Sequence, residues 1–147
     1  MKLSTRTRYG MRALMDLAIH GSEKTVQLKD IAKRQDISLS YLEHLVMPLV
    51  SAGMVKSTRG ARGGIKLGRP ARQIRLVEIL EVLEGPLAPV ECLKDSKYCP
   101  RSGACATQDV WNEMKEAMGN VLSTQTLQDL ADRQKTKYGQ SPAMYYI

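Results

Sequence analysis

The amino-acid sequence predicts a mainly α-helical fold with a small β-hairpin wing, arranged as a winged helix-turn-helix followed by a long dimerisation helix. Three observations lead to this prediction. Two amphipathic segments separated by a tight turn follow a first helical segment, a glycine-rich link then joins two short apolar runs, and a heptad seam occupies the second half of the chain. Helix, turn, helix and hairpin in this order are typical of a winged helix-turn-helix.

The first helix is expected to run from about Ser4 to His20. Ser4 is a favoured N-terminal cap, and Gly21 is a favoured helix end. The apolar positions of this segment fall on one face, and three arginines lie away from that face, namely Arg6, Arg8 and Arg12. We therefore predict a core helix with a basic outer face.

The helix-turn-helix is expected over residues 28–52. A helix at about 28–34 is followed by the turn Gln35–Ile37 and by a helix at about 40–52, which Gly53 ends. The residues predicted to face inward from the later helix are Leu42, Leu45, Val46, Leu49 and Val50. Pro48 lies inside that helix and is expected to bend or weaken it.

A hairpin is expected next, because the apolar runs Met54–Val55 and Ile65–Leu67 flank the glycine-rich link 57–64. The link does not resemble a nucleotide-binding loop, since it lacks a Gly-Lys-Ser/Thr ending and does not precede a helix. An amphipathic helix at 75–84 follows and is stopped by Gly85-Pro86.

The second half of the chain is expected to begin with an ordered loop without secondary structure at 86–107. A helix at 109–122 then carries a seam whose members step by three and four, namely Trp111, Met114, Met118, Val121 and Gln125. Two such helices could bury this seam by crossing, which predicts a homodimer whose reading helices lie about one DNA turn, roughly 34 Å, apart. Thr126 and Asp129 mark the start of a last helix.

The charge is unevenly distributed along the chain. Residues 1–75 carry 15 Lys and Arg against 5 Asp and Glu, whereas residues 76–147 carry 7 against 10. A basic first half indicates a polyanionic partner for that half, although a solvated basic surface is the simpler alternative.

The predicted fold places several polar side chains where double-stranded DNA would be read. Candidate major-groove residues at the start of the later helix of the pair are Ser38, Ser40, Tyr41 and His44. Arg59, Gly60 and Arg62 are the candidate wing residues, because guanidinium groups suit phosphates and narrow minor grooves. The alternatives are an ordinary three-helix core and a surface hairpin, but the order of all these elements favours DNA binding.

The loop at 86–107 contains all three cysteines, Cys92, Cys99 and Cys105. Disulfides are disfavoured in a cytosolic chain, so metal or redox chemistry is the better explanation. No close Cys-x2-4-Cys pair typical of structural zinc is present, and widely spaced thiolates can surround an iron–sulfur cluster. A thiol redox switch without metal and three incidental cysteines are the alternatives.

Several segments of the chain resemble the IscR-type regulators, in the superfamily that also contains NsrR and CymR. The resemblance rests on the residues 3–10, 37–43 and 58–64, on the cysteine loop followed by Trp111, and on the segment 126–130. It implies a dimeric winged-helix transcription regulator with a 2Fe–2S cluster that senses cluster supply. The alternative within the same fold is a sensor of nitric oxide or of thiol redox stress. The retained cysteines argue against the cluster-free CymR-like branch.

The resemblance leaves the fourth cluster ligand open. IscR-type proteins of enteric bacteria have a histidine where this chain has Gln108, a poor iron ligand, and NsrR-like proteins have an acid where it has Arg8. We predict Glu43 as the fourth metal ligand, with His44 and Asp109 as the other donors to consider. The simpler explanation for Glu43 is that Ser40 to Glu43 form a capping box, in which Glu43 only closes the start of the helix.

The sequence thus predicts four regions: a DNA-binding winged helix-turn-helix at 1–85, a cluster-binding loop at 86–108, dimerisation helices at 109–136 and a flexible tail at 137–147. A core is feasible at this length without disulfides. No signal peptide and no stretch of about 20 apolar residues is found, so we expect a cytoplasmic protein without a membrane partner. No catalytic set is recognisable, which predicts neither enzymatic activity nor a small-molecule substrate.

Overall fold

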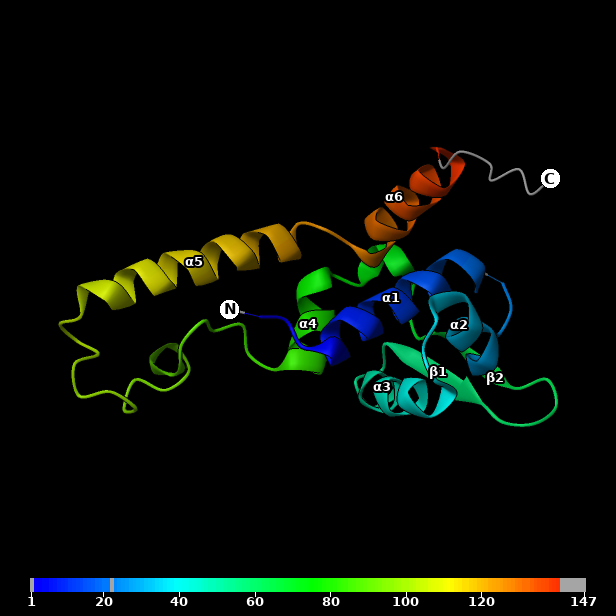
Figure 1. Ribbon diagram of the computed structural model, residues 1–147, viewed down its shortest axis with the longest axis horizontal. Coiled ribbons are helices and arrows are strands. Elements are labelled where there is room, and N and C mark those ends of the chain that lie inside the picture. Colours follow the sequence, from blue (N-terminus) through cyan, green and yellow to red (C-terminus); the bar gives the residue numbers. More distant parts are fainter. Residues whose placement is uncertain (1, 22, 141–147) are drawn as a thin grey trace.

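The computed structural model describes residues 2–21 and 23–140. It is mainly helical with one antiparallel two-stranded hairpin, as predicted. The elements are α1 (Thr5–His20), α2 (Leu28–Gln35), α3 (Leu39–Ser51), β1 (Val55–Thr58), β2 (Gly64–Leu67), the 3-10 turn η1 (Ala71–Gln73), α4 (Leu76–Glu84), the 3-10 turn η2 (Glu91–Leu93), α5 (Ala106–Ser123) and α6 (Leu127–Gln140). Figure 1 shows α1 to α4 and the hairpin packed together, with α5 extending away from them.

The start of α1 is fixed to the end of α4. The Ser4 hydroxyl accepts from the Thr7 amide as the predicted cap, and it donates to a carboxylate oxygen of Glu84 at 2.6 Å. The Thr7 hydroxyl donates to the same oxygen. These donors lower the pKa of Glu84, so the carboxylate stays charged and holds the two helix ends together immediately before the cysteine loop.

The helix-turn-helix differs from the prediction at the start of its later helix. The side chain of Ser38 caps α3 by accepting from the Tyr41 amide, so α3 begins at Leu39 and not at Ser40. Glu43 is therefore beyond the first turn, and the capping box of Ser40 and Glu43, the simpler explanation considered for Glu43, is not formed. Asp36 adopts the left-handed conformation (φ 52°) in the turn, and α3 continues through Pro48 to Ser51.

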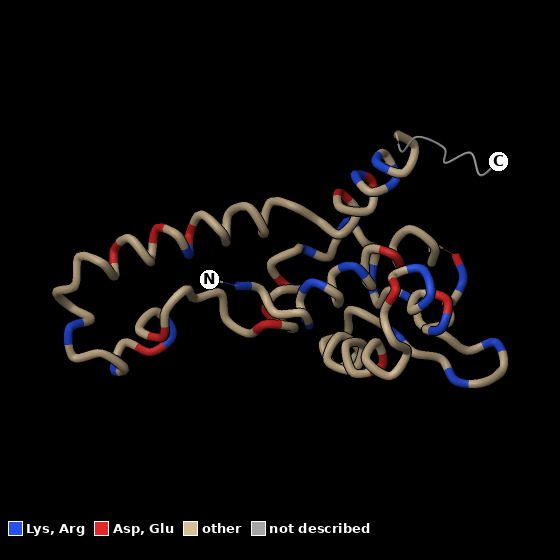
Figure 2. The backbone as a smooth tube through the Cα atoms, in the orientation of Figure 1, with Lys and Arg blue, Asp and Glu red and all other residues tan. Residues whose placement is uncertain are grey.

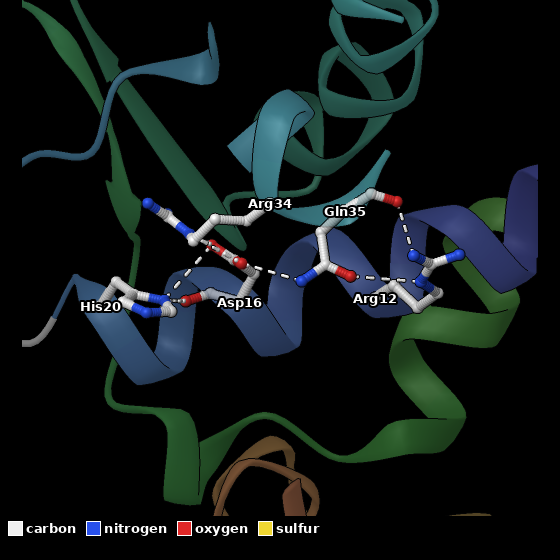
Figure 3. Close-up of polar contacts among 5 residues, drawn as sticks. All are labelled: Arg12, Asp16, His20, Arg34 and Gln35. Carbon is white, nitrogen blue, oxygen red and sulfur yellow. Dashed lines mark hydrogen bonds and ion pairs between the residues drawn. The ribbon is translucent and has the colours of Figure 1, made fainter. Parts of the chain in front are cut away.

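A polar network inside the domain joins α2 to α1 (Figure 3). Asp16 is 1% exposed, and its carboxylate accepts from the Arg34 guanidinium at 2.7 Å and from the Gln35 amide at 2.8 Å. Arg12 donates to both the side chain and the backbone carbonyl of Gln35. Hydrogen bonding to Asp16 raises the pKa of Arg34, so the guanidinium stays charged, and its contact with Asp16 fixes how α2 lies on α1.

The two strands of the hairpin have distinct faces. Val55 and Ile65 are buried on the face that packs toward α3, and Lys56 lies directly opposite Lys66 on the other face. Val26 pairs with Ile65 as an isolated bridge and so extends the edge of the hairpin toward the start of α2.

Two predicted boundaries in the second half of the chain are wrong. The segment 86–107 contains the short turn η2, and α5 begins at Ala106, before the predicted 109. Helix α6 continues to Gln140, so residues 137–140 are helical and are not part of a tail. The remainder of that predicted tail, 141–147, lies outside the described residues. Thr126 and Asp129 bond reciprocally at the start of α6, as predicted.

Across the described ranges, no helix combines the length and apolar character needed to cross a membrane.

Candidate nucleic-acid interface and cysteine loop

Three of the four predicted major-groove residues are exposed where α3 begins. Ser38, Ser40 and His44 all lie in the exposed class, and the Ser38 side chain also serves as the helix cap. The fourth, Tyr41, is half-buried, because its ring packs edge-on against Tyr9 with centroids 6.1 Å apart. Only the outer part of Tyr41 is therefore available to a partner.

Apolar side chains that the sequence reading missed are also exposed on α3. Met47 is 65% exposed and lies three residues after His44, and Leu39 is exposed beside the Ser38 cap. Val50, predicted to face inward, is also exposed. The sequence signal was present, since Met47 falls outside the buried stripe of Leu42, Leu45 and Leu49. Apolar side chains at such positions suit contacts with thymine methyl groups.

The predicted wing residues lie together in the loop between β1 and β2. Arg59, Gly60 and Arg62 are all exposed. Gly60 has φ 106°, a conformation that favours glycine, and its carbonyl accepts from the Gly63 amide at 2.8 Å. This tight turn presents two guanidinium groups at the end of the hairpin, where Figure 2 shows two separate basic segments.

Glu43 lies in a hollow between α3 and the hairpin, not beside the cysteines. The hollow has a volume of about 410 Å³, and its lining includes Leu28, Glu43, Met47, Ser57 and Ile65. Figure 1 shows the cysteine segment at the far end of α5, well separated from α3. Within one chain, therefore, the structure does not bring Glu43 to the loop.

The cysteine loop holds three free, half-buried thiols. The Gln108 side chain donates to the Cys92 carbonyl at 3.2 Å, which ties the start of the loop to the first turns of α5. Cys105 is the N-cap of α5, and its sulfur lies 3.1 Å from the Thr107 hydroxyl. That hydroxyl and the Gln108 backbone amide lower the pKa of Cys105, which favours the thiolate that binds metals.

The donor set of the loop fits an iron–sulfur cluster in chemistry, because three free thiols on one segment are the soft ligands that such clusters take. In residues 2–21 and 23–140, no three His, Cys, Asp or Glu side chains are already gathered as a metal site. Gln108 is engaged with backbone, which accords with its being a poor ligand.

The sequence profile of the Rrf2 family matches residues 3–133. The description of that family is iron-dependent transcriptional regulator. The chain belongs to the Rrf2 family. It is 48% identical over 130 residues to the protein Rrf2 of Nitratidesulfovibrio vulgaris, covering 88% of this chain and 87% of that protein.

Solved structures of Rrf2-family regulators share the fold. CymR, the global cysteine regulator of B. subtilis, superposes with a TM-score of 0.77 at 42% identity, covering 90% of this chain and 98% of the other. IscR of T. potens superposes with a TM-score of 0.75 at 40% identity, covering 91% and 88%. The predicted fold class and the predicted family are thereby confirmed, and this Rrf2-family chain is a transcriptional regulator.

The heptad seam of this Rrf2-family chain lies on a helix with little cover. None of the described side chains of α5 is buried, and Met114 and Val121 are exposed. An apolar hollow of about 410 Å³ lies at the inner end of α5, between Leu3, Leu80, Met118 and Val121. An uncovered apolar seam beside an apolar hollow is suited to a second protein surface.

Proposed function

We propose that this regulator binds operator DNA as a homodimer and that a 2Fe–2S cluster on Cys92, Cys99 and Cys105 controls the binding. Regulation of iron–sulfur cluster biogenesis is the role that we propose for it, following its resemblance to IscR. One observation supports the proposal above all others. A single chain has an exposed helix-turn-helix and wing at one end and three free thiols on one loop at the other end. Helix α5 extends between that loop and the domain formed by α1 to α4 and the hairpin (Figure 1).

In this proposal, the start of α3 enters the major groove and the wing contacts the backbone or an adjacent minor groove. Ser38, Ser40, Tyr41 and His44 would contact bases or phosphates, and Arg59 and Arg62 would contact the groove edge. The exposure of Arg59 and the tight turn at Gly60 support the wing contact.

Replacing Arg59 by Ala is expected to weaken operator binding by about 1–3 kcal/mol, if its guanidinium reads a base or a narrow groove. Binding should also weaken steeply with salt, because phosphate contacts release counterions. The measurement is a titration of labelled operator by fluorescence anisotropy at several salt concentrations. Arg133→Ala, an exposed arginine on α6, is the matched control and should leave the affinity within twofold. Equal affinities for the parent and Arg59→Ala would remove the wing from the interface.

The cluster, when bound, would supply a redox-active and iron-dependent centre to the loop. The chain's own contribution would be the three thiolates, with Gln108 holding the Cys92 backbone and Thr107 favouring the thiolate of Cys105. These two contacts support the assignment of this loop as the cluster site.

Replacing Cys92, Cys99 and Cys105 together by Ser is expected to abolish cluster binding, because oxygen is a poorer partner for iron–sulfur chemistry than thiolate. Protein purified without oxygen should be coloured, and the triple variant should be colourless and contain no iron or acid-labile sulfide. Circular dichroism should show that both proteins are folded. A triple variant with the visible spectrum of the parent would overturn the assignment.

We propose Glu43 as the fourth ligand, supplied by the partner subunit, since it lies far from the cysteines of its own chain. Its exposed carboxylate would also repel DNA phosphates in the cluster-free protein. Glu43→Ala should therefore shift the cluster spectrum and make the cluster-free protein less selective among DNA sites. Glu81→Ala, an exposed carboxylate on α4, is the control. If both readouts match the parent, His44 and Asp109 become the next donors to test.

A second candidate function is a cluster-free thiol redox switch on the same fold. The lowered pKa of Cys105 favours it, because the thiolate is the form that oxidants attack. The same anaerobic preparation separates the two functions. A colourless, iron-free parent whose DNA binding changes on mild oxidation would support the thiol switch and overturn the cluster.

A further inference from the structure

A cavity of about 560 Å³ opens at the base of the hairpin, away from α3 and from the cysteine loop. Four parts of the chain converge on it: the end of α1, the link after it, the hairpin with its exit segment, and the second residue of α6. The polar side chains that line it are Lys24, Lys56, Lys66, Arg69, Gln128 and Glu23. Its size is within the range of small-molecule sites.

The charge of this cavity is strongly positive. Lys56 and Lys66 are directly opposite each other in the hairpin register, and like charges so placed destabilise a sheet. Within the described ranges, neither lysine forms an ion pair. Lys24 adds a third ammonium group, and Glu23 is the one carboxylate among the lining residues. An anion between the lysines would relieve their repulsion.

Arg69 adds an unused hydrogen-bond donor at the edge of the cavity. Its Nη2 donates to Glu78 at 2.5 Å, whereas its Nε is buried without a hydrogen-bond partner in the described part of the chain. A buried donor without a partner is costly. Turning this edge of the guanidinium toward an anion would give Nε a partner, and it would move the Nη2 that donates to Glu78.

The cavity is on the face of the hairpin opposite to α3, which is the helix of the proposed DNA interface. Ser57 and Ile65 line the hollow on the α3 side, and side chains alternate along a strand, so Lys56 and Lys66 point to the opposite side. The wing residues Arg59 and Arg62 lie beyond the strand ends. A ligand held by the two lysines would therefore be separate from the helix that reads DNA.

We propose that this cavity binds a small polyanion carrying phosphate or carboxylate groups, held by Lys24, Lys56 and Lys66 with Arg69 at its edge. Because Gln128 of α6 lines the same cavity as the hairpin, the bound anion fixes the wing relative to α6. The site thus gives the regulator a second input that needs neither the cysteines nor α3.

The test is calorimetric titration of pyrophosphate and of citrate into the full-length protein at low ionic strength. The parent is expected to bind one anion molecule per chain. It should also unfold at a higher temperature when that anion is present. In K56Q/K66Q, which removes both charges but keeps polar side chains, the Kd should rise by about tenfold or more through the loss of two charge-assisted hydrogen bonds. Lys24→Gln, outside the strands, should raise it by about threefold or more.

The matched control is K135Q/K137Q, which removes the same charge from exposed positions on α6. Its Kd for the anion should stay within twofold of the parent. No binding of either anion to the parent overturns the proposal, and so does an equal loss in the control, which would indicate general attraction to a basic protein. A loss of DNA affinity in K56Q/K66Q without any anion binding would assign the cavity to the DNA backbone and would also overturn it.

Discussion

Replacing Asp16 by Ala is expected to lower the free energy of unfolding by about 2–4 kcal/mol and the melting temperature by roughly 5–15 °C. The carboxylate is almost fully buried and accepts from Arg34 and Gln35 (Figure 3). Its removal leaves the Gln35 amide buried without an acceptor and a cation without its partner. Breaking a buried pair typically costs about 3–5 kcal/mol, and the expected value is lower because the Arg34 side chain is 34% exposed.

Chemical denaturation of the parent and variants measures this effect. Asp30→Ala is the control, because Asp30 is an exposed acid in the first turn of α2 and its loss should cost less than about 1 kcal/mol. A double cycle with Arg34→Ala isolates the ion pair from the general loss of packing. If Asp16→Ala is no more destabilised than Asp30→Ala, the network does not hold α2 on α1. Because α2 precedes the reading helix, the variant should also bind operator more weakly.

The predicted elements that the structure confirms are those whose boundaries have a local chemical cause. Ser4 and Gly21 limit α1, and Thr126 with Asp129 starts α6, because caps satisfy free backbone groups within a few residues. The start of α3 was misplaced since Ser38 and Ser40 are both good caps, and only the geometry of the turn at Asp36 selects Ser38.

The site was predictable in its residue types but not in its long-range neighbours. Periodicity cannot show that Tyr41 packs against Tyr9, or that Val50 lies beyond the part of α3 covered by the core. The Asp16 network was missed because its partners lie 18 and 19 residues away. The cavity at Lys56 and Lys66 depends on the hairpin register, which turn geometry helps to set, and on Gln128 of α6. The approach of Gln128 to the hairpin is a long-range contact that no local sequence pattern shows.

Introducing a charge into the seam of α5 is expected to convert the proposed dimer into a monomer and to weaken operator binding by at least about 100-fold. Val121 is 57% exposed in the single chain, so Val121→Glu should leave the fold of the monomer intact. In a dimer that buries the seam, the same carboxylate would be placed in an apolar interface without a partner, which is costly. Loss of the dimer removes the simultaneous binding of two half-sites, which typically contributes a factor of 10²–10⁴.

Sedimentation velocity at micromolar concentration, combined with operator titration, tests this interface. Asn120→Glu adds the same charge on the side of α5 away from the seam and should remain dimeric with unchanged operator affinity. Circular dichroism should show that Val121→Glu has the same helical content as Asn120→Glu. A parent that sediments as a stable monomer, or a Val121→Glu protein that remains dimeric, would place dimerisation elsewhere. If instead the monomeric variant retained full operator affinity, the two half-sites would have to be bound independently. Helix α5 would then no longer explain how a signal at Cys105, its N-cap, reaches the DNA-reading end of the molecule.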